Sequence, residues 1–341
     1  MTVTPQTNAD LERAARFLLD HDDFVVCGHM NPDGDCIGSQ LGLAAALRAC
    51  GKRAACVLAR RDEVPANLRF LPGAADIVPA ADFEGPCGAF VAVDVPSRER
   101  ICDATALLDA AAASLTIDHH AAPERMTDLA HVDPDAPAAA LLVWRVAGLM
   151  GAQTSEVARC CYTGVVTDTG RFQNQNTTAE SLRAAADMLD AGANVVEVAS
   201  EVYQSRSLAA IRLEARAVER MRFSSNGQVA MSWIDLDDLE ELGARPADAE
   251  TLVETLRAVA GVRVACMMRG QGEATRGSLR AVGDAEVLGL ARSFGGGGHL
   301  AAAGFTVHAP VDSAREQVWE ALCARWSPAD QDGRRTGAVG A

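Results

Sequence analysis

Basic residues, aromatic residues and long apolar segments are all scarce in this sequence of 341 residues. Lys and Arg number 31 against 46 Asp and Glu, so the formal net charge is −15, and aromatic residues make up only 4%. A protein that binds long nucleic acid has a broad basic face, and extended base-stacking platforms need many aromatic side chains. We therefore expect no long nucleic acid as a partner, and any nucleic acid bound here to be short.

Membrane and secretion signals are also missing. No stretch approaches the roughly 18 uncharged apolar residues of a membrane span, and the N-terminal segment lacks the apolar stretch of a secretory signal. We expect a cytoplasmic protein with no membrane partner. The 10 cysteines include no Cys-x-x-Cys pair and mostly lie inside apolar runs, which is typical of buried reduced thiols rather than of a disulfide framework.

Apolar runs alternate with helical patterns over the first half of the chain. The predicted strands are 24–27, 53–58, 90–93 and 115–117, and the predicted helices are 35–50, 136–150 and 154–166. This alternation is typical of an α/β fold, here an N-terminal domain built on a parallel sheet with helices on both faces.

The second half begins with a helical connector and continues into a smaller α/β domain. Residues 181–221 are helix-compatible, and Leu208, Ile211, Ala215 and Val218 form one apolar stripe. Beyond the Asn-Gly turn at 226–227, strands are predicted at 228–234, 262–268, 278–282 and 305–308, with helices near 249–258 and 285–293. We place the first domain at 10–195, the connector at 196–225, the second domain at 226–326 and a disordered tail at 327–341.

The segment Gly-His-Met-Asn-Pro-Asp-Gly-Asp at 28–35 follows an apolar strand and opens a helix. Open α/β sheets bind ligands in the loops at the carboxyl ends of their strands. His29, Asp33 and Asp35 can converge there on a divalent metal ion. The alternative is that Asp33 and Asp35 only cap the helix, because such side chains accept hydrogen bonds from the first amides of a helix.

Aspartates end three further apolar runs, at Asp94, Asp118 and Asp168, and two histidines, His119 and His120, follow the second of them. Buried unpaired carboxylates cost several kcal/mol each, so this recurrence indicates nearby cations. The four carboxylates that can bind metal, Asp33, Asp35, Asp94 and Asp168, together carry a charge of about −4, which two divalent ions would balance.

Mixed imidazole and carboxylate ligands favour Mn²⁺ over Mg²⁺, which prefers oxygen ligands; Co²⁺, Fe²⁺, Zn²⁺ and Mg²⁺ itself stay open as alternatives. Two such ions roughly 3.5–4 Å apart activate a water molecule and clamp the oxygens of a phosphoryl group. The sequence therefore predicts hydrolysis of a phosphate ester.

These motifs resemble those of the DHH phosphoesterase superfamily, which is named for its Asp-His-His sequence. All four metal motifs match in order: His29-x-x-x-Asp33-x-Asp35, Asp94, Asp118-His119-His120 and Asp168. The resemblance implies that His29 and Asp33 hold a first metal ion, that Asp35, His119 and Asp168 hold a second, and that Asp94 bridges the two. It also implies that His120 assists phosphate binding and that Asp118 supports the imidazoles.

The second domain resembles the DHH-associated domain through Phe-Gly-Gly-Gly-Gly-His at 294–299 and Ala-Ala-Gly-Phe at 302–305, with the companion strand Gly-Ser-Leu-Arg at 277–280. Glycines let backbone amides approach an anion, and Arg and His side chains donate to phosphate oxygens. The substrate-binding candidates are Arg280, Gly296, Gly297, Gly298 and His299. The alternative is that the glycine run is a flexible linker.

Two smaller features concern the same family: one agrees with its pattern and the other departs from it. Arg100, six positions after Asp94, matches a family arginine that steadies the active-site loop or a phosphate, and a surface salt bridge is the alternative. Residues 136–141 read Ala-Pro-Ala-Ala-Ala-Leu where relatives commonly carry a Ser-Thr pair and a glutamate. No metal ligand is lost by this departure, but we expect different local hydrogen bonds.

The sequence is most similar to the nano-RNase/pAp phosphatase branch, through Asp-Thr-Gly-Arg-Phe at 168–172 and Asn-Thr at 176–177. This implies hydrolysis of short oligoribonucleotides to mononucleotides, of 3′-phosphoadenosine 5′-phosphate (pAp) to AMP, or of linear or cyclic diadenylate, by a protein that is often a homodimer. An inorganic pyrophosphatase of the same superfamily and a non-catalytic nucleotide-binding protein stay open as alternatives.

Overall fold

The computed structural model describes residues 8–121 and 125–327. Most of the predicted disordered tail, from 328 onward, lies outside the described residues. The chain divides into two compact units at Ser205 and Arg206, a boundary that falls within the predicted connector. None of the described helices is long and apolar enough to cross a bilayer.

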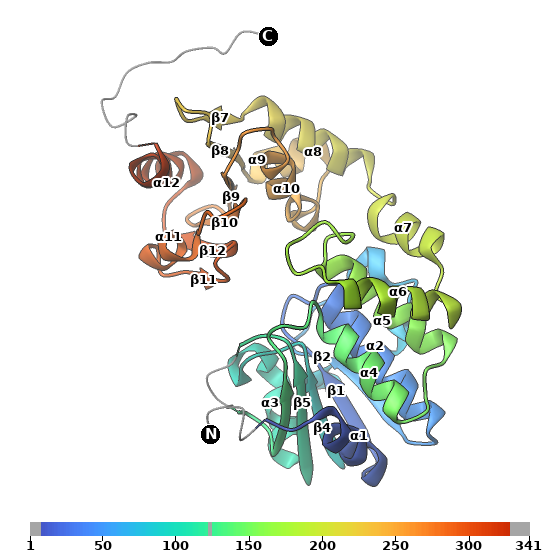
Figure 1. The fold of residues 1–341 in the computed structure, drawn as a ribbon. Coiled ribbons are helices and arrows are strands. Elements are labelled where there is room, and N and C mark those ends of the chain that lie inside the picture. Colours follow the sequence, from blue (N-terminus) through green and yellow to red (C-terminus); the bar gives the residue numbers. More distant parts are fainter. Residues whose placement is uncertain (1–7, 122–124, 328–341) are drawn as a thin grey trace. The chain divides into compact units, whose positions relative to one another are not determined.

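The first unit contains a six-stranded parallel sheet with the strand order β3-β2-β1-β4-β5-β6 (Figure 1). The strands are β1 (Phe24–Cys27), β2 (Ala54–Leu58), β3 (Val78–Pro79), β4 (Ala89–Val93), β5 (Ala113–Asp118) and β6 (Leu129–Val132). The direction of progression reverses between β1 and β4, and open sheets of this kind bind ligands beyond the carboxyl ends of the strands at such a point. The predicted parallel sheet is therefore confirmed.

Helices cover both faces of this sheet, because its central strands bury both sets of alternating side chains. In β1, Phe24 and Val26 join one apolar cluster, whereas Val25 and Cys27 join the other. The first cluster packs under α2 (Gly34–Ala49), α4 (Ala139–Leu149) and α5 (Ser155–Asp168), and the second under the 3-10 segment η4 (Arg98–Ala104) and α3 (Thr105–Ala110). Helices α1 (Leu11–Asp20), α6 (Ala179–Asp190) and α7 (Val195–Tyr203) complete this unit.

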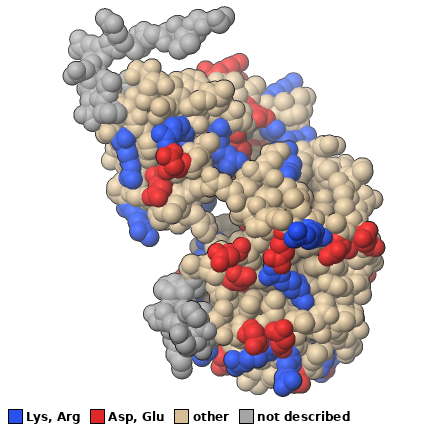
Figure 2. Space-filling view, in the orientation of Figure 1, with Lys and Arg blue, Asp and Glu red and all other residues tan. Residues whose placement is uncertain are grey.

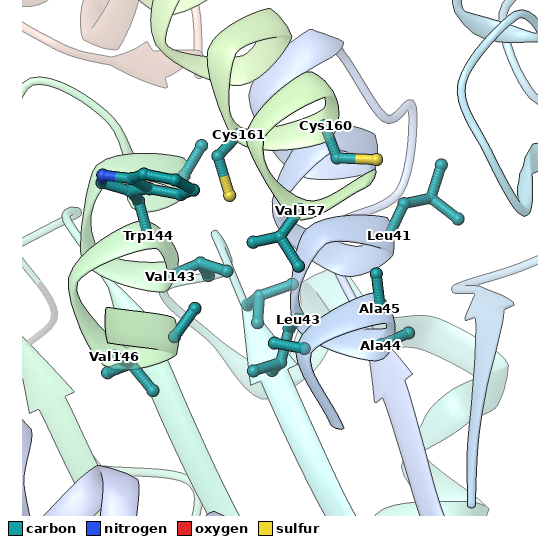
Figure 3. Packing of buried hydrophobic residues seen from close by; sticks show 14 of the residues in the cluster. Leu41, Leu43, Ala44, Ala45, Val143, Trp144, Val146, Val157, Cys160 and Cys161 are labelled. Atoms are coloured by element: carbon teal, nitrogen blue, oxygen red, sulfur yellow. The ribbon is translucent and has the colours of Figure 1, made fainter. Parts of the chain in front are cut away.

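Helices α2 and α5 approach each other unusually closely. Gly34, Gly38 and Gly42 recur every four residues on the face of α2 that meets α5, and a Cβ atom at Gly38 would lie 2.6 Å from Cys160 O. Figure 3 shows Cys160 and Cys161 of α5 beside the labelled side chains of α2. The glycines let the two backbones come close, which sets the spacing between residues at the ends of these helices.

The second unit contains a six-stranded sheet in the order β11-β12-β10-β9-β8-β7. Its strands are β7 (Arg222–Phe223), β8 (Val229–Ile234), β9 (Val264–Gly270), β10 (Thr275–Ala281), β11 (Gly297–Gly298) and β12 (Ala302–Val307). Only β8 and β9 pair in parallel. Helices α11 (Leu288–Ser293) and α12 (Val311–Trp326) pack against one apolar cluster of the sheet, and α8 (Leu208–Glu219) and α10 (Leu252–Arg257) against the other; α9 (Leu236–Leu242) follows β8.

The apolar stripe of the connector helix α8 is not the face that packs against the sheet. Leu208, Ile211, Ala215 and Val218 are all exposed, whereas Ala210, Leu213 and Ala217 are buried against the sheet. Both stripes recur at helical spacing, so periodicity alone does not choose between them. The smaller side chains of the second stripe allow a closer approach, and Ser232 Oγ of β8 donates to Ala217 O at 2.6 Å.

Two expectations from composition agree with the structure. All ten cysteines are free thiols, and seven of them are buried. Figure 2 shows acidic and basic side chains interspersed over the face in view, without a broad basic surface.

Candidate metal centre

Asp33 and Asp35 have different local roles at the start of α2. Asp33 is the N-cap, and its Oδ1 accepts hydrogen bonds from the backbone amides of Asp35 and Cys36 at 3.1 and 3.0 Å. The same oxygen lies 3.8 Å from His29 Nε2, and the side chain is 63% exposed. Capping and metal binding are therefore compatible in Asp33.

Asp35 is buried, and its carboxylate points toward the N-terminus of α4. Its Oδ2 accepts from Ala139 N at 2.7 Å and its Oδ1 from Ala140 N at 2.9 Å. The unpaired amides and the dipole of a helix N-terminus stabilise a carboxylate. These donors are backbone groups, so the alanines that replace the usual Ser-Thr pair still bind Asp35.

Asp94 lies at the end of β4, between three histidines. Its Oδ2 is 3.4 Å from His29 Nε2, and its Oδ1 is 3.3 Å from His119 Nε2 and 3.5 Å from His120 Nδ1. The residue is buried, and its φ of 53° lies in the left-handed region, which aspartate and asparagine tolerate better than most residues. Backbone strain of this kind is typical of functional sites.

Backbone carbonyls fix the orientation of two histidine rings. His29 Nδ1 lies 3.0 Å from Met30 O, and His119 Nδ1 lies 3.2 Å from Ala136 O. A carbonyl only accepts, so each Nδ1 carries the proton, and in a neutral ring the lone pair is on Nε2. Both Nε2 atoms face the Asp94 carboxylate, which is the arrangement that metal-binding histidines show.

Asp118 supports the imidazoles from the end of β5. Its Oδ1 accepts from the backbone amides of His119 and His120 at 2.8 and 3.1 Å, and it lies 2.9 Å from His120 Nδ1. Asp118 is fully buried behind the two rings. Its contacts therefore hold both histidines in place.

The candidate ligands other than Asp33 meet in three overlapping groups within the described residues. In each group the ligand atoms lie within 4.8 Å of one another: His29, Cys36 and Asp94; Asp94, His119 and His120; and Asp35, His119 and Asp168. Asp94 Oδ1 is buried and accepts no hydrogen bond from the described residues. A buried carboxylate oxygen of this kind needs a cation, so the donor set fits divalent metal ions.

The pKa values of Asp35, Asp168 and His119 are raised in this cluster, whereas that of Asp94 is lowered. Burial and the charges of Asp94 and Asp168 raise the pKa of Asp35 well above its usual range, and burial raises the pKa of Asp168 to about 7. Burial also favours the neutral form of His119, but the Asp94 and Asp35 carboxylates outweigh this effect and raise its pKa to about 10. The His119 and His29 imidazoles in turn outweigh the burial of Asp94 and hold its pKa below the usual range.

We expect Mn²⁺ to bind more tightly as the pH rises. Below about pH 7 Asp168 retains a proton that a metal ion must displace, and the His119 proton must also leave. Each displaced proton makes the affinity rise about tenfold per pH unit, and the slope decreases above the pKa of Asp168. Calorimetry in buffers of different ionisation enthalpy would measure the protons released, and an affinity that is constant between about pH 5.5 and 7 would contradict this prediction.

The other predicted site residues have mixed surroundings. The backbone carbonyl of Arg100 accepts a hydrogen bond from Met30 N at 2.9 Å. The side-chain Nε of Arg100 is buried without a hydrogen-bond partner among the described residues. Arg280, Gly296, Gly297, Gly298 and His299 lie in the second unit. Arg280 Nε donates to Glu254 Oε1 at 2.7 Å. Sequence reasoning missed Cys36 as a group near the cluster, although its position next to Asp35 was a signal.

Comparison with known proteins identifies the family. The family model of the DHH N-terminal domain matches residues 23–165, and that of the DHHA1 domain matches residues 226–324. The bifunctional oligoribonuclease and PAP phosphatase NrnA of Thermus thermophilus is 33% identical over 299 residues, which cover 87% of this chain and 88% of that protein. This chain belongs to the DHH family. The predicted family is thereby confirmed, and with it the enzyme class, a hydrolase of phosphoester bonds.

Solved structures of DHH proteins share the fold. An exopolyphosphatase-related protein from Bacteroides fragilis has a TM-score of 0.86 at 26% identity, with 94% of this chain and 96% of that chain covered. RecJ from Thermus thermophilus, solved in complex with Mn²⁺, has a TM-score of 0.52 at 16% identity, with 93% of this chain and 55% of that chain covered.

Proposed function

We propose that this protein is a two-metal phosphoesterase that hydrolyses short oligoribonucleotides and pAp. One observation carries the proposal: the Nε2 atoms of His29 and His119 lie 3.4 and 3.3 Å from the two oxygens of Asp94. A carboxylate between two imidazoles with their lone pairs turned inward is suited to bridge two cations. The name of the Thermus thermophilus relative supports the substrate class.

We assign the first ion to His29 and Asp33, the second to Asp35, His119 and Asp168, and the bridging position to Asp94. Mn²⁺ is the ion that this mixed donor set favours. Two divalent ions would supply an activated water molecule and positive charge for the phosphoryl oxygens. The protein's own contribution is to hold the donors in place.

We assign to His120 the binding of a phosphate oxygen of the substrate. Asp118 fixes its ring through the 2.9 Å contact with Nδ1, and Asp94 Oδ1 lies 3.5 Å from the same nitrogen. The neighbouring ring of His119 packs edge-on at a centroid distance of 4.6 Å. These contacts restrict His120 to one orientation beside the metal ligands, which lowers the entropic cost of substrate binding.

The net charge of −15 is consistent with a short substrate. A narrow site with local Arg and His side chains can hold a few phosphates, whereas an acidic surface repels a long polyanion. The same proposal includes a homodimer, which the resemblance implies, and a place in the cytoplasm, which the sequence predicts.

Product identification over a substrate panel tests the proposal directly. Purified protein with Mn²⁺ is incubated with pAp, pApA, an RNA dimer, linear and cyclic diadenylate, and pyrophosphate. We expect mononucleotide release from the adenylate or RNA substrates and little phosphate from pyrophosphate. Preferred turnover of pyrophosphate would favour the pyrophosphatase alternative, and nucleotide binding without turnover would favour the non-catalytic one.

We expect His299→Ala to weaken substrate binding rather than the chemical step. A hydrogen bond to a charged group is worth about 1.5–3 kcal/mol, so its loss raises KM for pAp about tenfold or more, with kcat nearly constant. Steady-state kinetics would measure both constants. His308→Ala, at an exposed position of the same unit, is the matched control and should leave both unchanged. A large fall in kcat with an unchanged KM would contradict the binding role.

A further inference from the structure

The chain after Asp168 turns back on itself through a strained segment. Gly170, Arg171 and Phe172 have φ values of 56°, 63° and 61°, so three consecutive residues lie in the left-handed region. Two of them carry side chains that disfavour this region, and such strain persists only where surrounding contacts hold it. The turn brings Asn176 back to the carboxylate at the end of α5.

The Asn176 side-chain amide contacts three oxygen atoms. Its Nδ2 lies 3.2 Å from Asp168 Oδ2, 3.3 Å from Asp168 O and 2.9 Å from Pro137 O. The two backbone carbonyls can only accept, so the NH₂ end of the amide must face this group. The opposite end, Oδ1, is buried without a hydrogen-bond partner among the described residues, so the orientation depends on the contacts of Nδ2.

Pro137 connects this contact to the second buried carboxylate. It directly precedes Ala138, the N-cap of α4, and the amides of Ala139 and Ala140 that follow bind Asp35. The Asn176 amide therefore contacts both the segment that binds Asp35 and the carboxylate of Asp168. Ligand atoms of Asp35 and Asp168 lie within 4.8 Å of each other and of His119.

We propose that Asn176 is a positioning residue that sets the geometry of Asp35 and Asp168 and thereby the affinity of the second metal ion. This inference rests on the proposed two-metal function. Residues that hydrogen-bond to metal ligands typically contribute about 10- to 100-fold to metal affinity. The hydrogen bonds of the Asn176 amide among the described residues go to Asp168 and Pro137 and not to His29 or Asp33, which would hold the first ion, so the affinity of that ion should be unaffected.

The turn that carries Asn176 is itself supported from α7. The Tyr203 hydroxyl donates to Val166 O at 3.3 Å, and the Arg171 guanidinium lies over the Tyr203 ring at 5.0 Å from its centroid. Arg171 N donates to the same carbonyl at 2.7 Å. Contacts of both the backbone and the side chain of Arg171 thus hold the strained turn, which keeps Asn176 next to Asp168.

Titration of Asn176→Ala with Mn²⁺ tests the proposal. Calorimetry gives the affinity of each ion, and electron paramagnetic resonance distinguishes a coupled Mn²⁺ pair from a single ion. We expect the second ion to bind about 10- to 100-fold more weakly and the first to bind as in the wild type. A general structural defect would weaken both ions, so equal losses at both sites, or no loss at either, overturn the proposal.

Asn174→Ala is the matched control. Asn174 Nδ2 donates to the backbone carbonyl of Asp168 at 3.3 Å, a contact that Asn176 Nδ2 also makes. We expect this variant to bind both ions within about threefold of the wild type. Thermal melting with a chelator verifies folding, and Asn176→Ser, whose hydroxyl is too short to reach Asp168, replaces the alanine variant if that one does not fold. Wild-type protein that binds no Mn²⁺ would overturn the proposed function, whereas a wild-type pair that Asn176→Ala leaves intact overturns only this inference.

Discussion

Asp94→Asn should lower kcat on pAp about a thousandfold while the protein stays folded. The substitution keeps the size of the side chain and suits the left-handed backbone at this position, where φ is 53°. It removes the charge that lies between His29 and His119. Loss of a bridging carboxylate removes several kcal/mol of transition-state stabilisation, and each 1.36 kcal/mol is tenfold in rate.

Turnover and bound manganese should be measured on the same Asp94→Asn preparation. Asp187→Asn, on the exposed side of α6, removes one carboxylate away from the cluster and should keep wild-type activity. Circular dichroism verifies that both variants fold. Activity of Asp94→Asn within tenfold of the wild type at saturating Mn²⁺ would show that Asp94 bridges no catalytic metal.

Gly38→Ala should destabilise the first unit by about 2–3 kcal/mol, which is the upper range for overpacking a tight contact. The new Cβ would lie 2.6 Å from Cys160 O and 3.0 Å from Gly164 N, and both are backbone atoms that cannot rotate away. Helices α2 and α5 must then separate. They carry Asp35 and Asp168, so the second metal ion should also bind more weakly. Differential scanning calorimetry should show a melting temperature lower by roughly 5–10 °C for this unit.

A second helical glycine serves as the control for Gly38. A Cβ at Gly148 of α4 would meet only the flexible end of Gln153, at 3.0 Å. Alanine is favoured over glycine inside a helix by about 1 kcal/mol, so Gly148→Ala should be neutral or slightly stabilising. Equal melting temperatures for the two variants would contradict the close-packing argument.

Four strands of the first sheet, β1, β2, β4 and β5, and the candidate ligands could be predicted because these strands are apolar runs and several apolar runs end in an aspartate, whereas β3 has only two residues and was missed. β6 was missed because Leu129–Val132 is short and contains His131, whose Nδ1 lies 2.8 Å from Ala9 O. Contacts such as Asn176 with Asp168 and Pro137 were also out of reach, because they depend on how a strained loop returns. Periodicity cannot show which of two competing stripes on α8 packs, since packing distance decides it.

The clustered candidate ligands come from positions 29, 35, 94, 119 and 168, so the chain must close long loops before they can meet. An ion bound by all of these groups would act as a reversible crosslink, which ties the beginning of the first unit to its later helices. Because the unfolded chain presents no such site, every increase in free manganese shifts the equilibrium toward the native state. The supply of metal would then govern how long the protein survives, as well as how fast it works.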